Sequence, residues 1–285
     1  MHTPVSFLLQ LYYFLNYSMR KPKMQLEHGM LIISVDVDVG SRELGVINKG
    51  RNDENISTQM TECRVGEIEE TAFPLFLEVF DHFQVPATFA VRGQLTEVND
   101  SILKALQKSS TKHDIGAHGY YHRRFTNLSS DEANNELKMI SIGMKKFGIT
   151  PRSFVFPKNN VAHLSLLEKY RYACYRSHGD FRSNCMYIEK KRKLYDIHPS
   201  LYITDSIGFG FLRKILDVAI AKSLPFHIWF HLWNFGETKE SMQRAIDRML
   251  FRLFKYGKKK EKIGNLSFET MFSAAEKVEM SLAGS

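Results

Sequence analysis

Two histidines four residues apart stand out in the segment HGYYH, residues 118–122. Imidazole nitrogen is a good ligand for zinc and other borderline divalent metals. His118 and His122 could reach one ion if the segment turns by about one helical step. The spacing alone is weak evidence, because histidine pairs of this kind also occur without metal. A carboxylate elsewhere in the chain would make the set more specific.

Two aspartates supply that carboxylate in the segment LIISVDVDVG, residues 31–40. In a strand, Asp36 and Asp38 point to the same side, where two carboxylates would repel each other unless a cation lay beside them. An Asp–His–His set leaves coordination positions for water and substrate, which is typical of a catalytic metal. The alternative is a pair of exposed acids at a strand end that hold the backbone of a turn.

The remaining polar residues suggest roles around this metal. If Asp38 is a ligand, Asp36 can act as the general base toward an attacking water. His231 ends the apolar run FHIWFH and is the candidate general acid, whereas His227, near the start of that run, is expected to be structural. Together, a metal, a base and an acid predict hydrolysis of an amide or ester through a tetrahedral intermediate.

Alternating strands and helices must position these residues. Apolar, β-branched runs predict strands at residues 31–40, 85–93, 113–119, 152–157, 172–177 and 226–231. Helical spacing predicts helices at residues 67–83, 101–110, 129–148, 164–170 and 209–223, and two helical stretches close the chain. Ser129 with Glu132 predicts a capping box at the start of the third helix, and Gly148 stands where its C-cap is expected. This rhythm predicts an α/β fold with a mostly parallel sheet, open or closed into a barrel. Asp36, His118 and His231 all fall at the carboxyl ends of predicted strands, where such folds place their functional residues.

Composition narrows the setting of the protein. The chain has 285 residues, which is enough for one large domain. Its net charge of +8 favours anionic partners. Its three cysteines, Cys63, Cys174 and Cys185, are far apart, which argues against a disulfide framework and favours a reducing, cytoplasmic setting. The apolar segment 6–17 is shorter than the roughly 20 residues that span a bilayer. We therefore interpret residues 1–30 as an N-terminal extension.

The sequence resembles the polysaccharide deacetylase family, also called the NodB-homology or carbohydrate esterase 4 group. Five segments carry the resemblance, in the family's order: SVDVDVG (34–40), ATFAVRG (87–93), HGYYH (118–122), FVFPKNN (154–160) and WFHLWNF (229–235). The resemblance implies an irregular (β/α) barrel over residues 31–275, followed by a C-terminal tail at 276–285. It also implies a divalent metal, with zinc as the expected ion.

The resemblance assigns roles residue by residue. It implies Asp36 as base, His231 as acid, and three metal ligands: Asp38, His118 and His122. The family's third segment carries an arginine that tunes the base. Lys158 stands near that place here and is counted among the catalytic residues, with Arg152 and Arg176 as competitors. Gly119 replaces the usual Ser or Thr after the first histidine, a change that bears on the substrate more than on the metal site.

These observations predict a metal-dependent hydrolase that removes acetyl groups from a carbohydrate or a small N-acetylated substrate. We expect no nucleic-acid partner and no transmembrane segment. One alternative keeps the metal site but acts on a cyclic amide or imide. Another is a barrel that binds an anionic polymer through its basic surface without catalysis.

Overall fold

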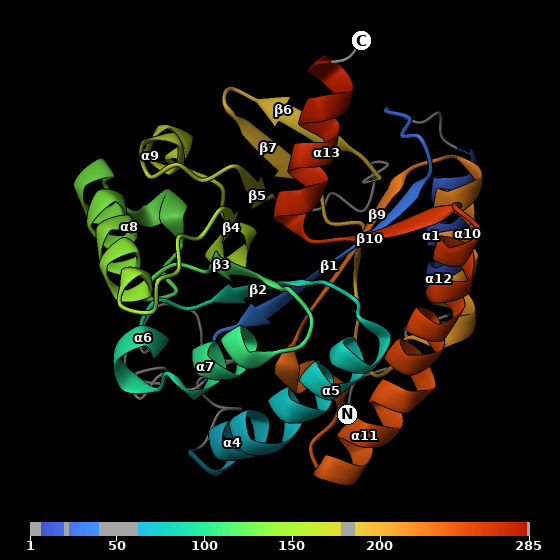
Figure 1. Ribbon diagram of the computed structural model, residues 1–285, viewed down its shortest axis with the longest axis horizontal. Helices are drawn as coiled ribbons and strands as arrows, with labels where there is room; N and C mark the ends of the chain where they lie inside the picture. The colour runs from blue at the N-terminus through green and yellow to red at the C-terminus, as the bar shows by residue number, and fades with distance from the viewer. Residues whose placement is uncertain (1–6, 20–22, 40–61, 178–185, 284–285) are drawn as a thin grey trace.

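A ten-stranded sheet, mostly parallel and curled into part of a barrel, forms the centre of the protein (Figure 1). The computed structural model describes residues 7–19, 23–39, 62–177 and 186–283. The strands are β1 Gly29–Val37, β2 Thr88–Val91, β3 Asp114–Ala117, β4 Ser153–Val155, β5 Cys174–Arg176, β6 Ile188–Lys191, β7 Leu194–Ile197, β8 Leu201–Tyr202, β9 Pro225–His231 and β10 Leu266–Glu269.

Hydrogen bonding places the strands in the order β6-β7-β5-β4-β3-β2-β1-β9-β8, with β10 beside the first half of β1. The β6–β7 pair is an antiparallel hairpin, and the other strand pairs of the described chain are parallel. Parallel neighbours need crossover connections, and helices supply most of them. This arrangement confirms the predicted irregular (β/α) barrel.

Helices surround the sheet (Figure 1). They are α1 Phe7–Met19, α4 Glu62–Glu67, α5 Phe73–Phe83, α6 Leu95–Val98, α7 Ser101–Lys108, α8 Ser130–Lys145, α9 Leu164–Lys169, α10 Phe209–Ala221, α11 Lys239–Ile246, α12 Arg252–Lys262 and α13 Met271–Ala283. Two π-helical segments, Ile68–Ala72 and Asp247–Phe251, join α4 to α5 and α11 to α12. Short 3-10 turns follow the site strands at Phe125–Asn127, Pro157–Asn159 and Leu232–Phe235.

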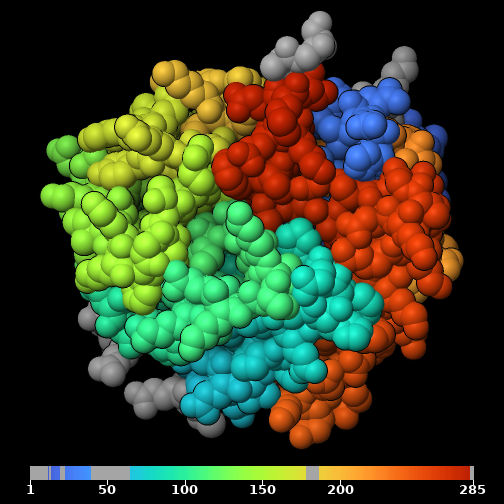
Figure 2. All heavy atoms as spheres, viewed as in Figure 1, coloured from blue at the N-terminus to red at the C-terminus, as the bar shows by residue number. Residues whose placement is uncertain are grey.

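Successive side chains along β1 point to opposite faces of the sheet. Leu31, Ile33 and Val35 join the large apolar core beneath the surrounding helices, whereas Met30 and Ile32 belong to a smaller cluster that includes residues of α13. Since side chains two apart share a face, Asp36 continues the second set toward the carboxyl end of the strand. Figure 2 shows α13, in red, packed between the blue N-terminal residues and the yellow-green segments. The amino-terminal half of this inner face is thus apolar and covered, and its carboxyl end is polar.

Several local predictions are confirmed. The capping box of α8 is present: the Ser129 hydroxyl accepts from the Glu132 amide, and the Glu132 carboxylate accepts from the Ser129 amide. Gly148 adopts the left-handed conformation expected beyond the end of this helix, with φ of 69°. The prediction for the end of the chain was incomplete, because β10 interrupts the helical stretches and pairs with β1.

The predicted domain boundaries remain predictions. The N-terminal extension contributes α1, whose Tyr17 hydroxyl donates to the carbonyl of Ser200. The predicted boundary at residue 275 falls inside α13, which continues to Ala283. Among the described residues, none of the helices is both long and apolar enough to cross a membrane.

Candidate active site

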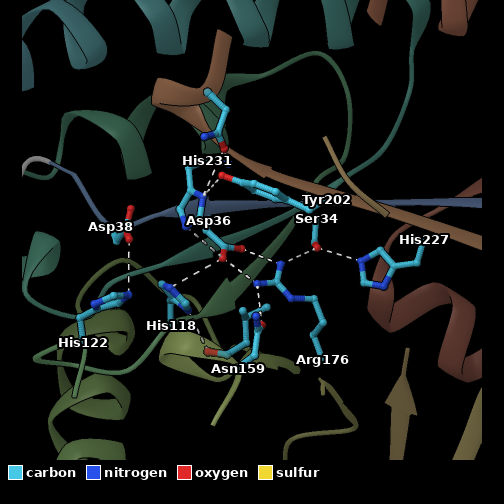
Figure 3. Close-up of polar contacts among 12 residues, drawn as sticks. Ser34, Asp36, Asp38, His118, His122, Asn159, Arg176, Tyr202, His227 and His231 are labelled. Carbon is cyan, nitrogen blue, oxygen red and sulfur yellow. Dashed lines mark hydrogen bonds and ion pairs between the residues drawn. The ribbon is translucent and has the colours of Figure 1, made fainter. Parts of the chain in front are cut away.

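The polar residues singled out in the sequence meet inside the barrel, at the carboxyl ends of the strands (Figure 3). β1 carries Asp36 and leads directly into Asp38, the turn after β3 carries His118 and His122, and β9 ends at His231. Parallel register places Asp36 beside His231 on the neighbouring strand. Segments nearly 200 residues apart in the chain therefore contribute to one site.

Asp38, His118 and His122 form a compact group of potential metal ligands. Each offers one ligand atom, and these atoms lie within 4.8 Å of one another. All three residues are buried, with 2% or less of their surface exposed. His122 Nε2 lies 3.4 Å from Asp38 Oδ2, yet both Asp38 oxygens and His118 Nε2 lack a hydrogen-bond partner within the described chain.

This arrangement is costly without a cation. Burial, together with the charge of Asp36, raises the pKa of Asp38 well above its usual value. Burial also lowers the pKa of His118 and His122, which favours neutral imidazoles with free lone pairs. A carboxylate and two neutral imidazoles are the donor set that a divalent metal prefers, and a bound metal would satisfy the orphaned atoms. The residues present therefore fit a divalent metal.

Backbone geometry orients the two histidines. His118 Nδ1 lies 2.9 Å from the carbonyl oxygen of Val155, an acceptor that places the proton on Nδ1 and leaves Nε2 available as a ligand atom, 3.9 Å from Asp36 Oδ2. His122 itself has φ of 57° and Gly119 has φ of 67°, so the segment turns sharply after β3. A Cβ added at Gly119 would lie 2.8 Å from Pro157 Cγ. Glycine at this position is therefore explained by the backbone turn and by the close approach of Pro157.

Asp36 is held differently from Asp38. Arg176 in β5 donates to both of its oxygens, from Nη1 to Oδ1 at 2.7 Å and from Nη2 to Oδ2 at 2.6 Å. Burial by itself would raise the pKa of Asp36, but the adjacent charge of Arg176 and its hydrogen bonds hold that pKa below the usual value. Asp36 is therefore an ionised carboxylate whose oxygens are already engaged, which suits a base better than a metal ligand.

A second row of buried groups holds Arg176 in place. Its Nη1 also donates to the Ser34 hydroxyl at 3.0 Å, and Ser34 lies 2.8 Å from His227 Nε2. Burial lowers the pKa of His227 to about 3, so its ring is neutral and can accept from Ser34 while Nδ1 faces the carbonyl of Ile197. This agrees with a structural role for His227, because its ring contacts Ser34, which accepts from Arg176, and does not contact the candidate metal ligands.

His231 occupies the most accessible part of this group. Its side chain is 17% exposed, and Nε2 lies 3.7 Å from Asp36 Oδ2. The backbone amide and Nδ1 of His231 both face Asn234 Oδ1, at 2.7 and 3.2 Å. Trp233 stacks on the His231 ring at 4.3 Å. Burial lowers the pKa of His231 to about 4, so the ring is neutral at pH 7.

Of the three candidates for the group that tunes the base, Arg176 makes the contact with Asp36. Arg152 lies at the other end of the barrel, where its guanidinium covers the ring of Phe272 in α13. Lys158 lies in the turn after β4 with φ of 57°, half-buried, and burial lowers its pKa. The catalytic role assigned to Lys158 stays a prediction, and the structure adds Arg176 to the site.

The middle of the chain matches a known protein family. Residues 65–174 match the family model described as polysaccharide deacetylase. The resemblance to the polysaccharide deacetylase family is confirmed. The matched segment contains His118 and His122, whereas Asp36, Asp38 and His231 lie outside it.

Several solved structures share the fold of this chain over nearly its whole length. An inferred polysaccharide deacetylase from Mycobacterium smegmatis aligns with a TM-score of 0.68 and 14% identity, covering 92% of this chain and 95% of its own. PuuE allantoinase aligns with a TM-score of 0.66 and 15% identity, covering 93% and 95%. Another inferred polysaccharide deacetylase, from Pseudomonas aeruginosa PAO1, has a TM-score of 0.66 and 14% identity, covering 93% and 96%. No curated protein matches the chain. At sequence identities of 14% and 15%, the similarity to these structures shows a shared fold and not a shared function.

Sequence reasoning missed three residues of the site: Ser34, Asn159 and Asn234. Ser34 precedes Asp36 by two positions in the same strand, so alternation alone placed it on the same face. Asn234 follows His231 by three positions, the spacing at which a side chain caps the first turn after a strand. Asn159, whose Oδ1 lies 3.5 Å from Arg176 Nη2, falls inside the segment FVFPKNN, but no spacing rule distinguished it from its neighbours.

Proposed function

We propose that the protein is a metal-dependent hydrolase that removes acetyl groups from a carbohydrate, at an amide nitrogen or at an ester oxygen. The observation that carries the proposal is the convergence of three buried ligand groups beside an arginine-paired carboxylate. Asp38, His118 and His122 offer ligand atoms within 4.8 Å of one another. Asp36 and His231 stand next to them with side-chain atoms 3.7 Å apart. The match to the polysaccharide deacetylase model supports the same reaction class.

Three side chains would hold the metal: Asp38 through a carboxylate oxygen, and His118 and His122 through Nε2. When bound, a divalent metal polarises a carbonyl group and makes water more acidic. Asp36 is the base: its Oδ2 accepts the proton of the water that attacks the acetyl carbonyl. Arg176 keeps this carboxylate ionised and fixes its plane. His231 Nε2 delivers a proton to the leaving nitrogen or oxygen.

A short proton path links the base and the acid. His231 is neutral at pH 7 and has to receive the proton that it delivers. Because Arg176 lowers the pKa of Asp36, the carboxylate holds a proton weakly and can pass it on. His231 Nε2 lies 3.7 Å from Asp36 Oδ2, a separation that a small movement or one water closes. Asn234 accepts from Nδ1 of the same ring and so keeps Nε2 turned toward Asp36.

Aromatic side chains next to His231 suit a sugar. Trp233 stacks on His231, and Tyr202 lies against Trp229 with ring centroids 4.4 Å apart. Aromatic faces bind the apolar faces of sugar rings, and a hydroxyl at the edge can hydrogen-bond. Tyr202 and Trp233 are partly exposed, which places an aromatic border at the accessible side of the site.

The proposal is tested by metal content and acetate release in matched variants. The purified protein should retain a divalent metal and release acetate from N-acetylated sugars, and a chelator should stop the release. Asp36→Asn should abolish turnover while metal stays bound, whereas Asp38→Asn should lose both. Asp247→Asn, at an exposed position in a π-helical segment, is the matched control and should behave as wild type. Metal loss in Asp36→Asn with retention in Asp38→Asn would reverse the two roles.

A cyclic amide or imide substrate is the second candidate. The solved structure of PuuE allantoinase covers as much of this chain as the deacetylases do, with a similar TM-score. The same base, acid and ligands would serve for ring opening, because both reactions break an amide bond. Ring opening faster than acetate release would favour this substrate class. Salt-sensitive binding of an anionic polymer, with neither reaction and no bound metal, would instead favour the non-catalytic hypothesis.

A further inference from the structure

A second group of potential metal ligands lies on the β6–β7 hairpin, at the edge of the sheet (Figure 1). Glu189 in β6, Asp196 in β7 and His198 just after β7 each offer one ligand atom, and these atoms lie within 4.8 Å of one another. Antiparallel register places Glu189 directly opposite Asp196. We propose that these three side chains bind a divalent cation, separate from the metal of the active site.

Two of the three groups are buried and incompletely satisfied. Asp196 is 0% exposed and His198 is 8% exposed. Within the described chain, Asp196 Oδ1 and His198 Nε2 have no hydrogen-bond partner. His198 Nε2 lies 3.5 Å from Asp196 Oδ2 and 3.7 Å from Glu189 Oε2, so the ring nitrogen is directed at both carboxylates. A buried acceptor that faces two carboxylates is unfavourable unless a cation or a proton lies between them.

The ring of His198 is held in the orientation that a ligand needs. Its Nδ1 lies 3.2 Å from the Ser177 hydroxyl, and the Tyr187 ring packs against it with centroids 3.9 Å apart. A hydrogen bond at one ring nitrogen, with the other nitrogen directed at carboxylates, is the arrangement found around metal-bound histidine. Ser177 follows Arg176 directly in the chain, so a cation here would tie the hairpin to the segment that carries Arg176.

Lys191 provides the competing explanation. Its Nζ lies 2.9 Å from Asp196 Oδ2 and 3.4 Å from Glu189 Oε2, and Tyr175 donates to the same Asp196 oxygen. These contacts compensate part of the negative charge but leave Asp196 Oδ1 and His198 Nε2 unsatisfied. The Lys191 side chain is 41% exposed, so it can turn into water without burying its charge. Lysine and metal should therefore compete for Asp196.

The donor set indicates the kind of metal. One imidazole and two carboxylates suit a borderline divalent ion such as Zn²⁺, and the absence of a second imidazole or a thiolate from the set predicts weaker binding than a closed structural zinc site. Zn²⁺ is the probe for the test. Equilibrium dialysis of the chelator-treated full chain against Zn²⁺ gives the number of bound equivalents and the Kd of each.

Variants of the two sites separate this inference from the proposed function. Wild type should bind two equivalents of Zn²⁺, and His198→Ala should bind one. The double variant His118→Ala/His122→Ala should keep the hairpin equivalent, and adding His198→Ala should remove it. If the active site bound no metal, wild type would bind one equivalent that His198→Ala alone abolishes. Failure of the proposed function is therefore distinguishable from failure of the hairpin site.

Two surface variants keep the test decisive if His198→Ala does not fold. Glu189→Gln changes a half-exposed residue and should raise the Kd of the hairpin equivalent by about tenfold or more, since one ligand is lost. Lys191→Met should lower that Kd by removing the competing ammonium group. The proposal would be overturned if the wild-type protein bound no Zn²⁺ at the hairpin, or if the Kd of the hairpin site were unchanged in both Glu189→Gln and Lys191→Met. The cluster would then be a salt-bridge network without a metal.

Discussion

Removing the guanidinium of Arg176 is the most informative perturbation of the site. Arg176→Met keeps much of the side-chain volume but leaves Asp36 without either of its hydrogen bonds, at 2.7 and 2.6 Å in the wild type. Both partners are buried, with side-chain exposures of 1% and 3%. Removing one member of such a pair leaves an uncompensated buried charge and costs about 3–5 kcal/mol of the free energy of unfolding. We expect a loss of that size at pH 7.

The loss should depend on pH in a defined direction. In wild type the pKa of Asp36 lies below its unfolded value, so the pair stabilises the fold above the unfolded pKa and loses this contribution as pH falls through the folded pKa. In Arg176→Met burial dominates, and the pKa of Asp36 should rise above its unfolded value. Protonation then removes the uncompensated charge in acid. The difference in stability between the two proteins should therefore be large at pH 7 and narrow as pH falls.

Urea unfolding of chelator-treated protein from pH 7 to pH 4 measures this difference, and acetate release at pH 7 measures the effect on turnover. Arg152→Met is the matched control, because that guanidinium lies over Phe272 at the other end of the barrel. It should change stability by less than about 1 kcal/mol. A loss below about 1 kcal/mol in Arg176→Met, or a difference that does not vary with pH, would show that Arg176 does not hold Asp36 in its ionised form.

Three further predictions concern the acid, the turn and a buried histidine. His231→Gln should lower turnover by about 10²- to 10⁴-fold while metal content stays the same, and metal loss would instead make His231 a ligand. Gly119→Ala should destabilise the fold by more than Gly148→Ala in thermal unfolding, because both have positive φ but only Gly119 meets Pro157 at 2.8 Å; equal costs would contradict the close approach. Burial lowers the pKa of His113 to about 4, so the unfolded chain binds more protons and stability falls between pH 6.5 and pH 4. His113→Phe should reduce that fall by about 3 kcal/mol in urea titrations, and an unchanged slope would exclude His113 as its source.

Local patterns were sufficient to predict most elements of the fold. The alternation of apolar strands with helical stretches predicted the parallel sheet, and the capping box at Ser129 marked the start of α8 correctly. β10 was missed because it has only four residues, LSFE, which follow a lysine-rich helix, and alternation over so short a run does not stand out. The strand exists because it pairs with β1, a long-range contact that no local pattern encodes.

The choice among Lys158, Arg152 and Arg176 shows where prediction stopped. All three are basic residues near the ends of predicted strands, and their spacing does not distinguish them. Arg176 reaches Asp36 although β5 and β1 are separated by β4, β3 and β2 in the sheet. Curling of the sheet brings the inner faces of these strands together, so the contact depends on the whole barrel and not on any one strand.

The sequence by itself determined which residues lie at the carboxyl ends of the strands, because parallel connections bring these ends to one edge. Residue types, their spacing and the family resemblance singled out Asp36, Asp38, His118, His122 and His231, and the predicted strands placed Asp36, His118 and His231 at that edge. The tertiary structure decided how they differ: Asp36 is paired with an arginine, Asp38 is left with two orphaned oxygens, and Asn234 orients His231. The physical reason is that strand periodicity sets the direction of a side chain locally, whereas its charge state depends on burial and on partners from distant strands.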